Sequence, residues 1–182
     1  MEPTAAEARI TGEGTLTGGL AGTPANLTLS FASNAAASDT VQIGSTTYTF
    51  VSTLAAANDV LIGAAASDTA SNLVAAITAG TGEGTTYGTG TVAHTDVTAA
   101  IGDTNTEVVL TARDAGTAGN AIAVDVESAT AEARITGEGT LTGGLDSTPA
   151  SLTLTSDANS KPKDTIEIGS TTYTFVLSLI HI

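Results

Sequence analysis

A histidine lies two residues before an aspartate in "AHTDV", within a chain rich in serine and threonine, and this is the residue set of a hydrolytic site. Such a site needs a nucleophile, a general base and an orienting acid held within hydrogen-bond distance. In so threonine-rich a chain, His94 meets Asp96 readily by chance. We therefore interpret His94 as a loop histidine near the start of a strand, and we expect no catalytic residues and no enzymatic activity.

Oxygen-bearing side chains alternate in "DTNTE", where Asp103, Asn105 and Glu107 are of the kind that calcium binds. The full calcium loop, with glycine at its sixth position and glutamate at its twelfth, is missing. We interpret the segment as a solvated turn between strands and expect no metal site. Weak calcium binding between repeats stays open, and calorimetry with calcium would test it.

Two glycine-rich segments invite a ligand-binding hypothesis. The run "GTGEGTTYGTGT" at 80–91 follows a predicted helix instead of opening one and contains no lysine, so we interpret it as a mobile surface loop and not as a phosphate cradle. "GTAGN" at 116–120 is typical of a turn in which Gly119 or Asn120 takes positive φ. Asn26 begins an "NLT" glycosylation triplet inside a predicted strand. We expect no cofactor and no cofactor-binding residues.

Charge and composition exclude several classes of partner. The 182 residues include 19 acids but only five bases, which are scattered along the chain: Arg9, Arg113, Arg134, Lys161 and Lys163. No basic stripe can form against nucleic acid or an anionic membrane. No cysteine is present, and no apolar run approaches the length of a membrane span. We expect neither nucleic-acid nor membrane partners.

A long internal duplication organises the chain. "AEARITGEGTLTGGL" occurs at 6–20 and again, letter for letter, at 131–145, and 33 of the 46 positions in 6–51 recur at an offset of 125 residues. This period has the size of an independent domain and not of a solenoid repeat. We expect 1–22 to be the C-terminal strands of a preceding repeat, 23–147 one complete repeat, and 148–176 the N-terminal hairpin of the next.

The duplication breaks at "LSLIHI", residues 177–182. These letters are what CTG-TCT-CTT-ATA-CAC-ATC encodes, a string that matches a transposon mosaic end used in preparing sequencing libraries. We hypothesise that this tail is translated adapter, so that His181 is not a candidate ligand. A genomic copy that reads the same six residues and then stops would refute the hypothesis.

Hydrophobic periodicity predicts a β-β-β-α-β-β-β order. In "SDTASNLVAAITAG" the apolar residues fall three and four apart, which predicts a helix at about 68–79, capped by Ser67 or Asp68 and ended by a left-handed Gly80. Strands are expected at 25–31, 40–44, 46–51, 96–101, 106–113 and 120–127, with another short one at 59–63 and a hairpin turn at Gly44-Ser45.

The expected fold class is α+β: a small, mostly antiparallel or mixed sheet whose apolar face is covered by the single helix. The predicted core positions come from the inward-facing residues of these elements. They are Leu27, Leu29, Val41, Ile43, Tyr48, Phe50, Leu61, Leu73, Ile77, Val97, Val109, Leu110, Ile122 and Val124.

The motifs "DTVQIGSTTYTFV", "NDVLIGAAASDTASNLVAAITAG" and "VVLTARDAGTAGNAIAV" resemble a tandem repeat module of structural proteins from tailed bacteriophages and prophages. The second half is also similar to the accessory module of contractile tail sheath proteins, although the glycine-rich insertion at 80–90 is longer than that module needs. The resemblance implies a virion tail component and brings no chemistry with it.

The first hypothesis is therefore a structural repeat of a phage or prophage tail protein, located in the virion, that acts as a spacer, decoration or attachment module. Its expected partners are other copies or neighbouring repeats, virion tail proteins and a host cell surface. The alternative is a repeat of a bacterial adhesin that is secreted or displayed on the cell surface. An enzyme is kept as a third class, with any catalytic domain outside this chain.

Overall fold

The computed structural model describes residues 10–11, 14–129, 133–156 and 161–176. It divides the chain into two compact units, the central unit Ala21–Thr148 and a flanking unit that combines Met1–Leu20 with Pro149–Ile182. The complete repeat expected at 23–147 falls within the central unit. The tail at 177–182, with His181, lies outside the described residues.

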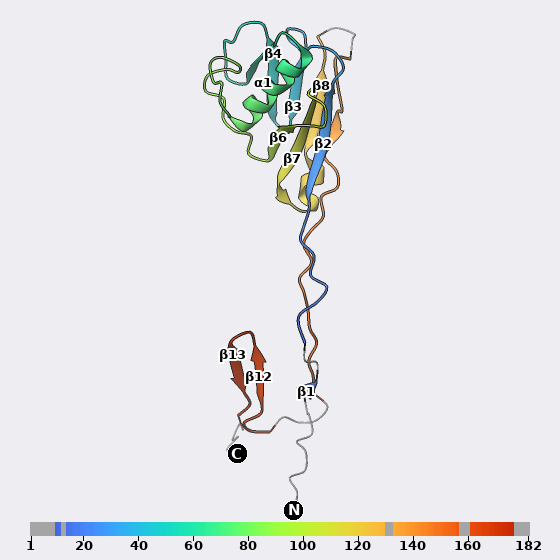
Figure 1. Cartoon of the computed structure of the whole chain (residues 1–182), viewed down its shortest axis with the longest axis vertical. Coiled ribbons are helices and arrows are strands. Elements are labelled where there is room, and N and C mark those ends of the chain that lie inside the picture. Colours follow the sequence, from blue (N-terminus) through green and yellow to red (C-terminus); the bar gives the residue numbers. More distant parts are fainter. Residues whose placement is uncertain (1–9, 12–13, 130–132, 157–160, 177–182) are drawn as a thin grey trace, which may run out of the picture. The chain divides into compact units, whose positions relative to one another are not determined.

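The central unit has the predicted α+β fold class, and its described part contains a single α-helix (Figure 1). Its strands and helices follow the expected order, and the short strand near residue 60 is present. In chain order they are β2 (Pro24–Phe31), β3 (Thr40–Ile43), β4 (Thr46–Val51), β5 (Asp59–Leu61), α1 (Ala66–Thr78), β6 (Val97–Ile101), β7 (Glu107–Ala115), the 3₁₀ helix η1 (Thr117–Ala121), β8 (Ala123–Glu127), β9 (Ile135–Thr136) and β10 (Gly139–Thr140).

The strands form two sheets instead of the single one expected. One has the order β10-β8-β3-β4-β5, in which only β4 and β5 are parallel, and the other is the antiparallel sheet β6-β7-β2-β9. The chain changes sheet between β2 and β3, between β5 and β6, between β7 and β8, and again on either side of β9. The rings of Phe31 and Phe50 meet edge to face between the sheets, with centroids 5.9 Å apart.

The core lies between these sheets and α1, which packs against β5 and β6. The predicted core residues are all buried or half-buried, and the half-buried ones are Leu27, Leu61, Val109 and Ile122. Val60 and Val108, the neighbours of Leu61 and Val109, are fully buried instead. Where apolar residues follow one another without polar residues between them, the sequence does not show which of them faces the core. The buried residue of each such pair therefore could not be predicted.

The helix begins and ends slightly earlier than predicted. Its N-cap is Ala65, whose backbone N–H donates to the Asp68 Oδ2 at 3.1 Å, so neither Ser67 nor Asp68 occupies the capping position. The left-handed residue at its end is Ala79 (φ 47°) and not Gly80, whose N–H closes the last turn on the Ala75 carbonyl at 2.9 Å.

The flanking unit contains β1 (Ile10–Thr11), β11 (Thr155–Ser156), β12 (Thr165–Ile168) and β13 (Thr171–Thr174). The β12–β13 hairpin pairs Ile166 with Tyr173, as the β3–β4 hairpin pairs Val41 with Tyr48. These two pairs are related by the 125-residue offset. The second copy of the hairpin therefore repeats the backbone register of the first.

Candidate functional site

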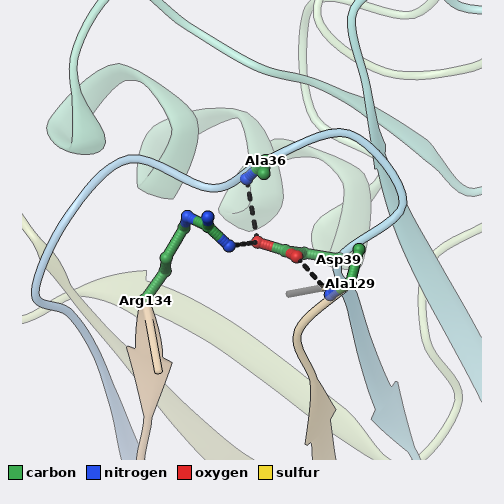
Figure 2. Close-up of polar contacts among 4 residues, drawn as sticks. All are labelled: Ala36, Asp39, Ala129 and Arg134. Carbon is green, nitrogen blue, oxygen red and sulfur yellow. Dashed lines mark hydrogen bonds and ion pairs between the residues drawn. The ribbon is translucent and has the colours of Figure 1, made fainter. Parts of the chain in front are cut away.

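A buried carboxylate joins the two sheets of the central unit (Figure 2). Asp39 lies directly before β3 and is 1% exposed. Its Oδ2 accepts a hydrogen bond from the Ala36 backbone N–H at 2.8 Å, and its Oδ1 accepts one from the Ala129 N–H at 2.7 Å. Arg134, directly before β9, places its Nη1 3.6 Å from Oδ2. We call these four residues the seam.

The seam supports the fold and offers no reactive group to solvent. Both oxygens of Asp39 accept main-chain hydrogen bonds, and the carboxylate faces a guanidinium that is itself mostly buried. A general acid or base must reach a substrate or a water molecule, which this carboxylate does not. Its chemical role is to hold the end of β8 and the start of β9 against the loop before β3.

His94 is buried, and its backbone N–H donates to the Ile77 carbonyl of α1 at 2.8 Å. Its Nδ1 accepts hydrogen bonds from the backbone N–H groups of Asp96 (3.1 Å) and Val97 (3.3 Å), so the ring proton is on Nε2, which faces the Ile43 carbonyl at 3.2 Å. The main chain of His94 accepts from the Arg113 Nε at 2.9 Å.

These contacts place His94 and Asp96 side by side without forming a hydrolytic site. The His94 ring accepts from the main chain of Asp96 and makes no hydrogen bond with its carboxylate, and each of its hydrogen bonds is with a backbone atom. In the described part of the chain, no side-chain hydroxyl makes a hydrogen bond with the ring. The arrangement fixes a ring between β3 and β6 and contains no nucleophile–base pair.

Glu107 closes the turn between β6 and β7. Its Oε2 accepts from the Thr104 N–H at 3.2 Å, and its own N–H donates to the Thr104 carbonyl at 3.0 Å. Asp103 and Asn105 are exposed in the same turn. Across the described ranges, no group of three or more His, Cys, Asp or Glu side chains is placed to hold a metal ion.

The glycine-rich segment at 80–91 is anchored at its centre instead of running free over the surface. Tyr87 is 2% exposed and its hydroxyl donates to the Gly80 carbonyl. Gly88 passes so close to the Ala56 carbonyl that a Cβ atom would lie 1.7 Å from its oxygen. The segment packs on β5, where Tyr87 forms a bridge with Val60 and the Gly88 N–H donates to the Asp59 carbonyl at 2.9 Å.

The "GTAGN" segment forms a 3₁₀ helix, and the prediction of positive φ at Gly119 or Asn120 is wrong. Positive φ occurs at Gly116 (φ 128°) and not at Gly119 or Asn120. Gly119 is required for a different reason, since a Cβ there would lie 2.9 Å from that of Ala112 and 3.1 Å from that of Ala25. Asn26 lies in β2 as expected, and its backbone pairs with Thr142.

Sequence reasoning missed the seam and the anchoring role of Tyr87. The available signal for the seam was recurrence, because Asp39 and Arg134 have identical counterparts in Asp164 and Arg9 at the 125-residue offset. Recurrence alone does not say that the two side chains meet. Tyr87 had no signal, since one aromatic residue within a glycine-rich run has no periodicity.

The comparisons identify no family. No protein-family model matches the chain, and no curated protein matches it significantly. Within the described ranges, no helix has the length and apolar character needed to cross a bilayer.

Proposed function

We propose that the chain is a structural repeat module of a phage or prophage tail protein and acts as a spacer, decoration or attachment unit of the virion. The observation that carries the proposal is the register shared by the β3–β4 and β12–β13 hairpins. A segment that recurs both in its residues and in its strand register is expected of a building block used repeatedly in a longer protein. The sequence resemblance to phage structural modules directs the proposal to a virion.

The polar residues of the central unit support a structural role over a catalytic one. Asp39 and His94 direct polar atoms to main-chain groups 90 and 51 residues away in the sequence, and the Tyr87 hydroxyl donates to the Gly80 carbonyl within its own segment. Buried polar groups that are satisfied in this way stabilise one arrangement of the chain. The proposed partners are other copies of the repeat, virion tail proteins and a host cell surface.

Immunogold electron microscopy tests the proposal. Antibodies raised against the whole chain would be applied to density-purified phage particles from the source culture, with pre-immune serum as the control. The proposal expects gold on tails or tail-associated structures. Gold confined to the surface of bacteria, with unlabelled particles, would reject the virion role and favour the adhesin alternative.

A further inference from the structure

One segment and its copy occupy equivalent places on two different strands. In the central unit, β9 pairs with the end of β2, so that Ile135 faces Phe31. In the flanking unit, β1 pairs with β11, so that Ile10 faces Ser156. The 125-residue offset converts one pair into the other. We call residues 135–145 the closing segment and residues 10–11 with 14–20 its copy. The strands with which they pair, 23–31 and 148–156 respectively, are called the opening strands.

The same register is kept several residues further on. Thr142 and Asn26 exchange two backbone hydrogen bonds of 2.8 and 2.9 Å, and the equivalent Thr17 and Ser151 exchange two of 3.1 and 3.0 Å. The two ladders therefore have the same register at two residue pairs several positions apart. A slip of one residue would disrupt the pairing at both positions.

A close glycine–alanine approach also recurs. A Cβ on Gly144 would lie 3.2 Å from that of Ala25, and a Cβ on Gly19 would lie 2.9 Å from that of Ala150. Any side chain at either glycine would press on the opening strand. The glycine thus marks the register in both units.

This register does not depend on burial in a core. Leu141 of the closing segment is 0% exposed, whereas its counterpart Leu16 is 59% exposed, and the pairing is the same. Register is usually imposed by the hydrophobic face that a strand buries. Here it is retained without that burial, so the main-chain pairs and the glycine–alanine approach are enough to specify it.

We propose that the closing segment is an exchangeable strand: its copy (10–11 with 14–20) in one chain pairs with the opening strand at 148–156 of a second copy of the chain. The structure forms this pair within one chain, and the same contacts are available between two chains. Pairing within one chain and pairing between two chains make the same contacts and differ mainly in the entropy of loop closure. Strand exchange between identical chains requires this equivalence of contacts. The proposal is independent of any virion role.

One difference between the two copies directs the exchange. After the closing segment, the Asp146 Oδ1 accepts a hydrogen bond from the Thr117 N–H at 2.8 Å, and the residue at the same place after the copy is Ala21. The central unit therefore holds its own closing segment with a contact that the copy lacks. The copy is left to pair with the other opening strand.

Cysteine pairing between full-length chains tests the exchange, because the chain has no cysteine of its own. The Thr17→Cys variant would be mixed with an isotope-labelled Ser151→Cys variant under mild oxidation. A hydrogen-bonded antiparallel pair has a Cα separation of about 5.5 Å, which suits a disulfide. The matched control uses Thr153→Cys in place of Ser151→Cys, because Thr153 is also exposed but lies two residues out of register.

Disulfide-linked heterodimers should form roughly tenfold faster in the in-register mixture than in the control mixture. Equal rates would overturn the proposal. It would also be overturned if the double variant T17C/S151C closed a disulfide within one chain while the mixture stayed at the control rate. The substituted side chains are all exposed, and the 222 nm signal of α1 verifies that the central unit of each variant is folded.

Discussion

Replacing Tyr48 by phenylalanine should stabilise the central unit. Tyr48 lies in β4 and is 0% exposed. Its hydroxyl has no hydrogen-bond partner among the residues that the structure describes. A buried polar group without a partner costs about 1–3 kcal/mol relative to water. Since the hydroxyl also contributes some packing, we expect Tyr48→Phe to raise the free energy of unfolding by about 1 kcal/mol at pH 7.

The same burial makes the effect depend on pH. Desolvation raises the pKa of Tyr48 from 10.0 to about 12. The unfolded chain loses the hydroxyl proton of Tyr48 near pH 10, while the folded chain keeps it to about pH 12. Between these pH values the unfolded state binds fewer protons than the folded state, so the free energy of unfolding falls as pH rises. Two pKa units correspond to about 2.7 kcal/mol. The advantage of the phenylalanine variant should therefore widen to about 3–4 kcal/mol near pH 12.

Urea unfolding followed at 222 nm measures this effect, because α1 is the α-helix of the described chain. The control is Tyr173→Phe, which makes the same change at the equivalent position of the flanking unit, where the side chain is 56% exposed. It should leave the unfolding midpoint unchanged. A Tyr48→Phe variant less stable than wild type at pH 7, or a difference that does not widen above pH 10, would refute the reasoning.

Three further predictions concern polar anchors of the central unit. Asp39→Asn should destabilise it by about 3 kcal/mol because Arg134 loses its charged partner, and adding Arg134→Met should recover part of this loss in a double-mutant cycle; full additivity would contradict an ion pair. His94→Ala should cost about 2–4 kcal/mol in urea unfolding, since buried main-chain groups lose their partners; a neutral result would show that the ring is dispensable. Hydrogen bonds from the Thr117 backbone and side chain lower the pKa of Asp146 below 3.8, so the stability advantage of wild type over Asp146→Asn should be complete above that pH and vanish as pH falls through the lowered pKa; an NMR-measured pKa at or above 3.8 would oppose this.

Features that depend on neighbouring residues could be predicted from the sequence. The helix around Leu73 and Ile77 and the alternating strands around Leu29, Val41 and Phe50 follow from local periodicity, and the structure places these residues in the core. The turn signals separated these elements correctly. The duplication was likewise visible as a direct repetition of letters.

Features that depend on non-local pairing could not be predicted in this way. Nothing in the alternation of β2 and β3 says that they belong to different sheets, because periodicity records which face of a strand is apolar and not which strand lies beside it. Likewise, the left-handed conformation falls on Ala79 and not on the next residue, Gly80, although glycine adopts it more easily. The position of this residue depends on where the helix ends.

The candidate sites divide along the same line. The residue types of His94, Asp96 and Glu107 raised hypotheses of catalysis and metal binding, and only the tertiary structure showed which atoms they contact. The seam shows the reverse case, since Asp39 and Arg134 are 95 positions apart in the sequence and meet only after both sheets have formed. The sequence by itself determined the duplication, the helix and the strands, because each is written in adjacent residues or repeated letters. The tertiary structure decided which distant side chains share one buried space, because burial depends on the packing of the whole unit.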